Sequence, residues 1–237
     1  MSESAEPPIA GSDVSPVIEE AGRQLRAPWA ASTAGILFSL LFTTALLLLR
    51  SQAMLDADDA ELIRQFAAGE DLAGLIGGLY LAPFAGIMFL WFIAVIRDQI
   101  GEREDRFFAT VFFGSGLLFV AILFAAVAVA SWPIVGVRYL GQAAPTAREI
   151  EMTRALSYTL LFAFGIRAAA VFLLAMSTVG LKSGVFPSWF GRAGYVVGVV
   201  LLVVVAIWDW VILVLPAWVA LISLVILRRE RTRQRAT

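Results

Sequence analysis

One arginine in the middle of a long apolar stretch is the residue of this sequence best placed to do chemistry. Arg167 has twelve uncharged residues before it, back to Arg154, and fourteen after it, up to Lys182. A helix rising about 1.5 Å per residue puts it roughly 18 Å from the outer end, near the bilayer midplane. A central arginine costs roughly 2.5–3.5 kcal/mol to insert, so its guanidinium should face the helix bundle or a wet cavity. Two roles stay open: a pin between helices, or a counter-charge for an anionic or polar ligand.

Two other residues are candidates to supply acceptors for this arginine. Asp209 follows a short apolar segment, 193–208, that spans only about 24 Å, so the turn at Asp209 should lie slightly below the membrane surface. Pro83 lies near the centre of the second apolar block, where a helix-interior proline frees the carbonyl four residues earlier, at Leu79. We therefore predict a ligand-binding or structural ion site that contains Arg167, Asp209 and Pro83.

Small residues recur every four positions along the second apolar block. They are Gly74, Gly78, Ala82 and Gly86, and Gly194 and Gly198 repeat the spacing further along the chain. This spacing places small side chains on one helix face, where another helix can approach closely. We interpret them as helix-packing residues; a pore lining or a dimer seam is the alternative.

Composition excludes most catalytic chemistry. The chain has no histidine and no cysteine, which rules out Cys/His zinc sites, histidine-ligated haem and a Ser-His pair. Ser115, between two glycines, would need Lys182 as its base, and we interpret it as a small polar residue in a packed helix. No pair of inward carboxylates is evident, although an enzyme acting on lipid remains a third hypothesis. We expect no catalytic residues, metal or cofactor, and with a net charge of −1 no nucleic-acid partner.

The elements that position these residues are apolar blocks long enough to cross a membrane. Of the 237 residues, 60% are hydrophobic and only 16% charged, compared with about 25% charged in soluble domains. We predict an all-α integral membrane protein with a bundle of six transmembrane helices in one domain, 28–227. The expected spans are 29–49, 72–96, 107–131, 155–181, 193–208 and 211–227. Trp132-Pro133 should end the third block, and Trp208-Asp209-Trp210 should divide the last apolar stretch into two short helices.

Charge placement predicts the orientation. With six spans and a cytoplasmic start, the inner segments hold twelve Lys and Arg residues and the outer loops five. The positive-inside rule then puts both termini in the cytoplasm and the protein in the plasma (inner) membrane. Residues 1–27 are expected to form a disordered cytoplasmic tail, and 228–237 a polybasic one.

Two polar loops between spans have weaker signals. Asp58 and Glu61 are spaced as at a helix start, which predicts a short helix on the outer surface. The inner loop from Arg97 to Arg106 alternates acids and arginines. A divalent ion or a partner protein would suit such a loop, but alternating signs are more typical of a solvated, self-paired turn.

A set of short motifs lies at Arg167–Phe172, Ser177-Thr178, Gly184–Trp189 with Gly194-Tyr195, and in the charged loop leading into Phe107–Thr110. In these motifs the sequence resembles bacterial six-span membrane proteins known only as domains of unknown function. The resemblance implies the same six-span topology and a bacterial, actinobacterial-type source, and it carries no activity.

These observations favour a non-catalytic membrane protein that acts through helix packing with lipid or a partner protein, with a homo-oligomer as one form. The alternative is a small carrier or binding protein for an anionic or polar solute or lipid headgroup, with Arg167 in a mid-membrane cavity.

Overall fold

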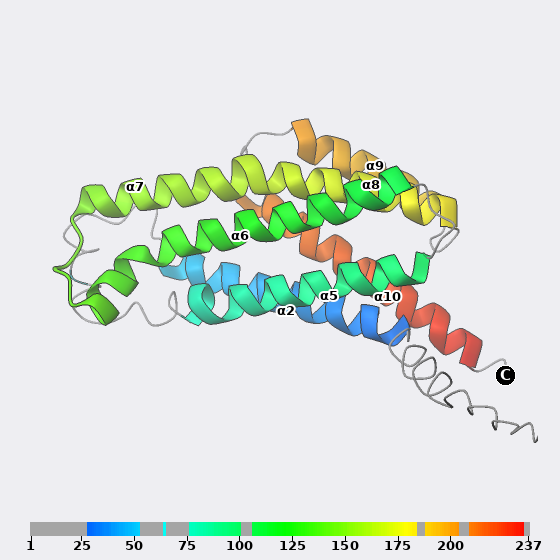
Figure 1. The fold of residues 1–237 in the computed structure, drawn as a ribbon, viewed down its shortest axis with the longest axis horizontal. Helices are drawn as coiled ribbons and strands as arrows, with labels where there is room; N and C mark the ends of the chain where they lie inside the picture. The colour runs from blue at the N-terminus through cyan, green and yellow to red at the C-terminus, as the bar shows by residue number, and fades with distance from the viewer. Residues whose placement is uncertain are drawn as a thin grey trace, which may run out of the picture.

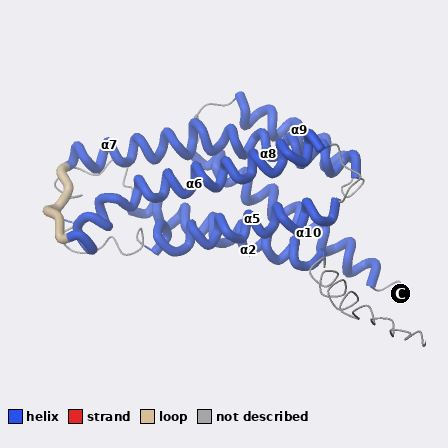
Figure 2. The backbone as a smooth tube through the Cα atoms, viewed as in Figure 1, coloured by secondary structure: helices blue, strands red, loops and turns tan. Residues whose placement is uncertain are grey.

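The computed structural model describes residues 28–52, 64, 76–100, 106–183, 188–203 and 209–234. Every element in these ranges is helical (Figures 1 and 2). The α-helices are α2 (Pro28–Gln52), α5 (Ala82–Ile100), α6 (Arg106–Leu140), α7 (Ala147–Tyr158), α8 (Ile166–Ser183), α9 (Ser188–Val203) and α10 (Val214–Gln234). Two π-helical turns, η1 (Ile76–Leu81) and η3 (Thr159–Gly165), precede α5 and α8, and a 3₁₀ turn, η4 (Asp209–Leu213), precedes α10.

Five helical segments in the described ranges are long and apolar enough to cross a membrane. They are Ala30–Leu49, Gly77–Arg97, Phe107–Leu140, Ala147–Lys182 and Trp210–Arg228. Helix α9 is apolar but shorter, with 16 residues. The chain is therefore an all-helical protein whose long helices suit a multi-pass membrane protein.

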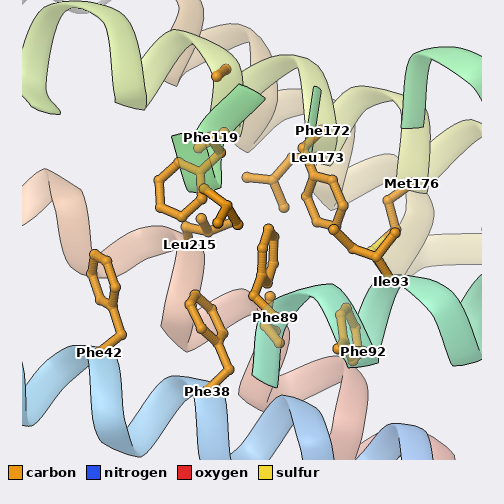
Figure 3. Packing of buried hydrophobic residues seen from close by; sticks show 14 of the residues in the cluster. Phe38, Phe42, Phe89, Phe92, Ile93, Phe119, Phe172, Leu173, Met176 and Leu215 are labelled. Atoms are coloured by element: carbon orange, nitrogen blue, oxygen red, sulfur yellow. The ribbon is translucent and has the colours of Figure 1, made fainter. Parts of the chain in front are cut away.

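Phenylalanines from four helices fill the centre of the bundle. Phe89 of α5 is fully buried and lies at its middle, with its ring centroid 4.5 Å from that of Phe38, 5.5 Å from Phe119 and 5.0 Å from Phe172 (Figure 3). These three partners come from α2, α6 and α8 respectively. Aromatic rings at such separations add to the packing of the helices that carry them. The core at this level is thus closed by side chains.

The pairs of helices that pack together show how the bundle surrounds this phenylalanine centre. Helix α2 packs against α5 and α10, α6 packs against α5, α7 and α8, and α9 packs against α8. Helix α9 lies on the outside of the bundle, beside α8, and Figure 1 shows it along the upper edge. Gly194 of α9 allows α8 and α9 to approach closely, since a Cβ at this position would come within 2.1 Å of Ser177 Oγ.

The third long helix corrects one expectation from the sequence. Trp132-Pro133 was predicted to end it, and this is wrong, because α6 continues through Pro133 to Leu140. The helix ends at Gly141, whose φ of 64° lies in the left-handed region that favours glycine, and the Gln142 N–H closes the end by donating to the Gly136 carbonyl at 3.0 Å. A tryptophan-proline pair therefore does not end this helix.

The following helix also starts earlier than the apolar block suggested. The fourth block was expected from residue 155, but α7 begins at Ala147. Thr146 accepts a hydrogen bond from the Glu149 N–H, and the Glu149 carboxylate accepts one from the Thr146 N–H at 2.7 Å, which forms a capping box. These backbone and side-chain hydrogen bonds from Thr146 lower the pKa of Glu149 below its ordinary value.

Helices α6 and α7 form a hairpin that projects beyond the other helices. Helix α6 has 35 residues, so it is about 52 Å long, against about 30 Å of membrane hydrocarbon. Ser131 of α6 lies against Gly78 of η1, and α6 extends nine residues beyond that level, to Leu140. In Figure 1 the hairpin extends to the left of α2 and α5.

Some predictions fall on residues that the structure does not describe. They are the tail 1–27, the surface helix at Asp58 and Glu61, the loop 101–105 and the end of the polybasic tail at 235–237.

Candidate functional site

Arg167 is the second residue of α8 and follows the π-helical turn η3 directly. Its side chain is half-buried. One guanidinium nitrogen, Nη1, donates a hydrogen bond to the carbonyl of Ala163, four residues earlier in the same helix. The guanidinium group of Arg167 thus contacts the backbone one turn earlier in its own helical segment.

The geometry of η3 explains why a carbonyl is available there. The Ile166 N–H donates to the carbonyl of Leu161, five residues back instead of four. When a helix returns from this spacing to the α spacing, one carbonyl of the turn loses its backbone donor. Ala163 lies two residues after Leu161, within this transition, and its carbonyl accepts a hydrogen bond from the Arg167 guanidinium.

The side of α8 that carries Arg167 is distinct from the side that enters the core. Phe172, Leu173 and Met176 are buried in the core cluster. Leu174, seven residues after Arg167 and near it in helical angle, instead lies where α9 packs: a Cβ at Gly198 would come within 2.8 Å of it. Arg167 therefore continues the edge of α8 that α9 covers further along.

Packing in the core gives the depth of this residue. Phe172 lies beside Phe89, and Arg167 comes five residues before Phe172, about 7.5 Å closer to the α7 end. The same distance along α5 in the same direction leads to Phe84, next to Pro83. Arg167 and Pro83 consequently lie at similar depths, each just after a π turn.

The predicted acceptors are not joined to Arg167 by a hydrogen bond in the described part of the chain. Pro83 is the second residue of α5 and follows η1, so the chain is irregular at that point. The guanidinium donates to Ala163 and not to Leu79. Asp209 is the first residue of η4, and its side chain lies outside the described part of the structure.

Two glycines of the second span face a neighbouring helix, α6. A Cβ at Gly78 would come within 2.5 Å of Ser131 Oγ in α6, and one at Gly86 within 2.4 Å of the Phe124 ring. Ala82 is almost fully buried. These three residues lie where α5 and η1 pack against other helices, and Gly74 lies outside the described residues.

The serines that lie against glycines of neighbouring helices were not predicted from the sequence. Ser223 of α10 lies against Gly35 of α2, and Ser39 donates to the Pro216 carbonyl of α10 at 2.8 Å. Ser131 Oγ is buried and, among the described residues, is the one buried side-chain polar atom without a hydrogen-bond partner. The signal was the spacing of Gly35 and Ser39, four residues apart on one face of the first block.

Ser115 is engaged with its own backbone. Its hydroxyl lies 2.6 Å from the Val111 carbonyl and 3.2 Å from the Phe112 carbonyl. Lys182 Nζ lies 4.5 Å from the centroid of the Phe108 ring, seven residues before Ser115 along α6. The ammonium group is thus held at the end of the bundle where α6 begins.

No protein-family model, no curated protein and no solved structure matches this chain. Within the described residues, no three His, Cys, Asp or Glu side chains come together as a group that would hold a metal ion. The fold therefore defines the class of the chain as a helical protein with several helices that suit a membrane.

Proposed function

We propose that this is a non-catalytic membrane protein that acts by binding a lipid or a partner protein at its lateral surface. The observation that carries the proposal is the position of Arg167, half-buried on the edge of α8 and away from the phenylalanine core. A charge at this depth needs acceptors, and one guanidinium nitrogen has the Ala163 carbonyl. A phosphate or carboxylate at the lateral surface would satisfy the remaining nitrogens.

The packing of the core supports the same proposal. Phe38, Phe89, Phe119 and Phe172 fill the bundle centre, where a carrier would need a solute cavity. The serines named above donate to carbonyls of their own or neighbouring helices, apart from Ser131. Polar groups in the bundle therefore serve helix packing, and ligand contact is left to the surface.

The test is the composition of protein extracted gently from membranes into lipid nanodiscs. We expect the wild type to retain a partner protein, a second copy or a tightly bound lipid, and a well-folded Arg167→Gln variant to lose it. Native mass spectrometry measures both. A wild type that is strictly monomeric and carries no partner or lipid would overturn the proposal.

A second candidate function is a carrier or binding protein for an anionic or polar solute. The observation in its favour is that two π turns, η1 before Pro83 and η3 before Arg167, lie at similar depths. Broken helices at mid-membrane are typical of transporter sites. Unchanged uptake and ligand binding in a well-folded Arg167→Gln variant would rule this candidate out.

The topology that we propose has six crossings in the plasma membrane of a bacterium, with both termini cytoplasmic and α9 as the short fifth crossing. Support comes from the excess of arginine in the segments on that side. Because the chain has no cysteine, single cysteines are clean reporters. An impermeant maleimide should label Arg148→Cys in intact cells and leave Arg192→Cys unlabelled; the reverse result would contradict the orientation.

A further inference from the structure

The helical segment that carries Arg167 has one face against the bundle and one face turned away from it. Apart from α7 and α8, which adjoin it in the chain, η3 packs mainly against α6 among the described elements. On that side, a Cβ at Gly165 would come within 3.5 Å of Ile122 in α6. On the other side, Phe164 is 56% exposed, and Leu156, about two turns earlier, is 53% exposed. This exposed face of η3 leads from Leu156 through Phe164 toward Arg167.

Arg167 lies at the end of this exposed face. It is half-buried, as is Ala163 one turn before it, whereas Ile166 and Ala168 on either side of it in the chain are buried. The guanidinium has five N–H donors, and its acceptor within the described residues is the Ala163 carbonyl. The Thr159 hydroxyl, one turn earlier, already donates to a carbonyl of its own helix at 2.8 Å. Arg167 therefore brings to this face a charge and donors for a further acceptor.

The depth of Arg167 distinguishes a lipid phosphate from a side-chain carboxylate as that acceptor. The Ser157 hydroxyl of α7 donates to the Ala126 carbonyl of α6 at 2.8 Å, and Ser131, beyond which the hairpin projects, comes five residues later in α6. The headgroup level on this side is therefore near Arg154, roughly 18 Å from Arg167. An arginine side chain covers only part of that distance, so a phosphate at the headgroup level is out of its reach. A neighbouring membrane helix, by contrast, can carry a carboxylate at any depth.

We propose that the exposed face of η3 binds a transmembrane helix of a partner protein that carries an Asp or Glu near the middle of its span. Charge complementarity selects a carboxylate, because pairing lowers the cost of both charges in hydrocarbon. The apolar side chains of Leu156 and Phe164 would lie against the same partner helix. A second copy of this chain is not the occupant, because its own η3 face would bring a second Arg167. This inference rests on the proposed function and names the partner of that same site.

The test uses two synthetic single-span helices of leucine and alanine that differ at one central residue, Glu in one probe and Gln in the other. Each is added to the full chain in phosphatidylcholine vesicles, and binding is measured by energy transfer from a dye on Arg148→Cys, a single cysteine because the chain has no other. We expect the Glu probe to bind roughly tenfold more tightly than the Gln probe.

Variants of the full chain locate the effect. Arg167→Gln should bind both probes equally, whereas Arg167→Lys keeps a cation and should keep most of the preference for the Glu probe. Arg192→Gln is the matched control: Arg192 also donates to a carbonyl four residues earlier, but it is exposed and lies in α9. This variant should prefer the Glu probe as the wild type does.

Equal binding of the two probes by the wild type would overturn the inference, and this result does not depend on the folding of any variant. Asp209, at the start of η4, is the competing acid within the chain. We expect Asp209→Asn to bind the Glu probe as the wild type does, and tenfold tighter binding would overturn the inference by showing that Asp209 occupies Arg167. The proposed function fails separately, through a wild type that retains neither partner nor lipid. A retained lipid that Arg167→Gln loses, together with equal binding of both probes, would keep the proposed function and overturn this inference alone.

Discussion

Two helices of this bundle carry a π turn, and they differ in what stands beside it. In the second span, η1 (Ile76–Leu81) is followed by Pro83, which has no N–H to donate. In the fourth, η3 (Thr159–Gly165) contains no proline and is followed by Arg167, whose guanidinium donates to the Ala163 carbonyl. The η1 turn thus lies beside a residue that lacks a backbone N–H donor, and the η3 turn lies beside a residue whose side chain adds a donor.

This difference distinguishes η1, a local irregularity of the backbone, from η3, a candidate functional feature. A proline alone does not require a π turn, because Pro133 lies inside α6, which stays α-helical. An arginine in the middle of a membrane costs free energy to insert, so a turn that offers its guanidinium a carbonyl acceptor is a specific arrangement. Since π turns occur often at functional sites, η3 is the one to which we attach function.

The largest expected effect comes from the contact that joins these two helices. Phe89→Ala removes a fully buried ring that lies 5.0 Å from Phe172, and we expect the free energy of unfolding in micelles to fall by about 3–5 kcal/mol. Phe84→Ala, on the exposed face of the same helix, is the control and should cost less than about 1 kcal/mol. Equal losses would show that the two helices are not joined through this core.

The next effect concerns the turn before Arg167. Arg167→Gln removes a charge-assisted hydrogen bond to a carbonyl, and we expect a loss of about 1.5–3 kcal/mol of unfolding free energy. Arg192 is the matched control, since its Nε also donates to a carbonyl four residues earlier, Ser188, at 3.2 Å, but it is exposed and lies outside any π turn. Arg192→Gln should change stability by less than about 0.5 kcal/mol. If both arginines give the same small change, the π turn does not depend on Arg167.

A smaller effect is expected on the proline side of the comparison. Pro83→Ala restores a backbone N–H, and η1 should relax toward regular α-helix with a gain of about 0.5–1.5 kcal/mol in unfolding free energy. Hydrogen exchange of the amides from Gly77 to Leu81 measures the change in the turn. Pro133→Ala is the comparison, because Pro133 lies inside an α-helix and not beside a π turn. Unaltered exchange in Pro83→Ala would mean that packing, and not the proline, sets η1.

The smallest effect lies at the start of the helix that leads into η3. Protonation of Glu149 removes the acceptor of the capping box, and its pKa is lowered in the folded chain by the Thr146 hydrogen bonds. The stabilisation is therefore present above the ordinary carboxyl pKa and is lost as the pH falls through the lower, folded value. Amide exchange at the start of α7 should rise at acidic pH in the wild type. Glu149→Ala should show that faster exchange already at neutral pH, whereas Glu151→Ala, in the same helix, should behave as wild type.

The sequence predicted the helical class well, because helix α2 and the described parts of the other blocks follow apolar runs in which Arg167 is the one charged residue. It failed at the α6–α7 hairpin, because α6 was expected to end at Trp132-Pro133 and the next helix to begin at residue 155. The signals for the true ends were present: Gly141 for the end of α6, and Thr146 with Glu149 three residues later for the start of α7.

The candidate site was only partly accessible to sequence reasoning. Arg167 stands out because a charge among apolar residues is conspicuous. Its contact with Ala163 lies at a π turn, and no residue type in Thr159–Gly165 predicts that turn. The serines that meet Gly35 and Gly78 could not be predicted for a similar reason, because contacts between distant helices depend on their register.

A high-resolution structure in a lipid bilayer, read at the guanidinium of Arg167, tests the central claim most directly. We predict one nitrogen on the Ala163 carbonyl and the others toward a lipid headgroup or a partner side chain at the lateral surface. A guanidinium turned away from Ala163 into a water-filled cavity that holds a solute, enclosed by α5, α6 and α8, would contradict the account and establish a carrier site instead.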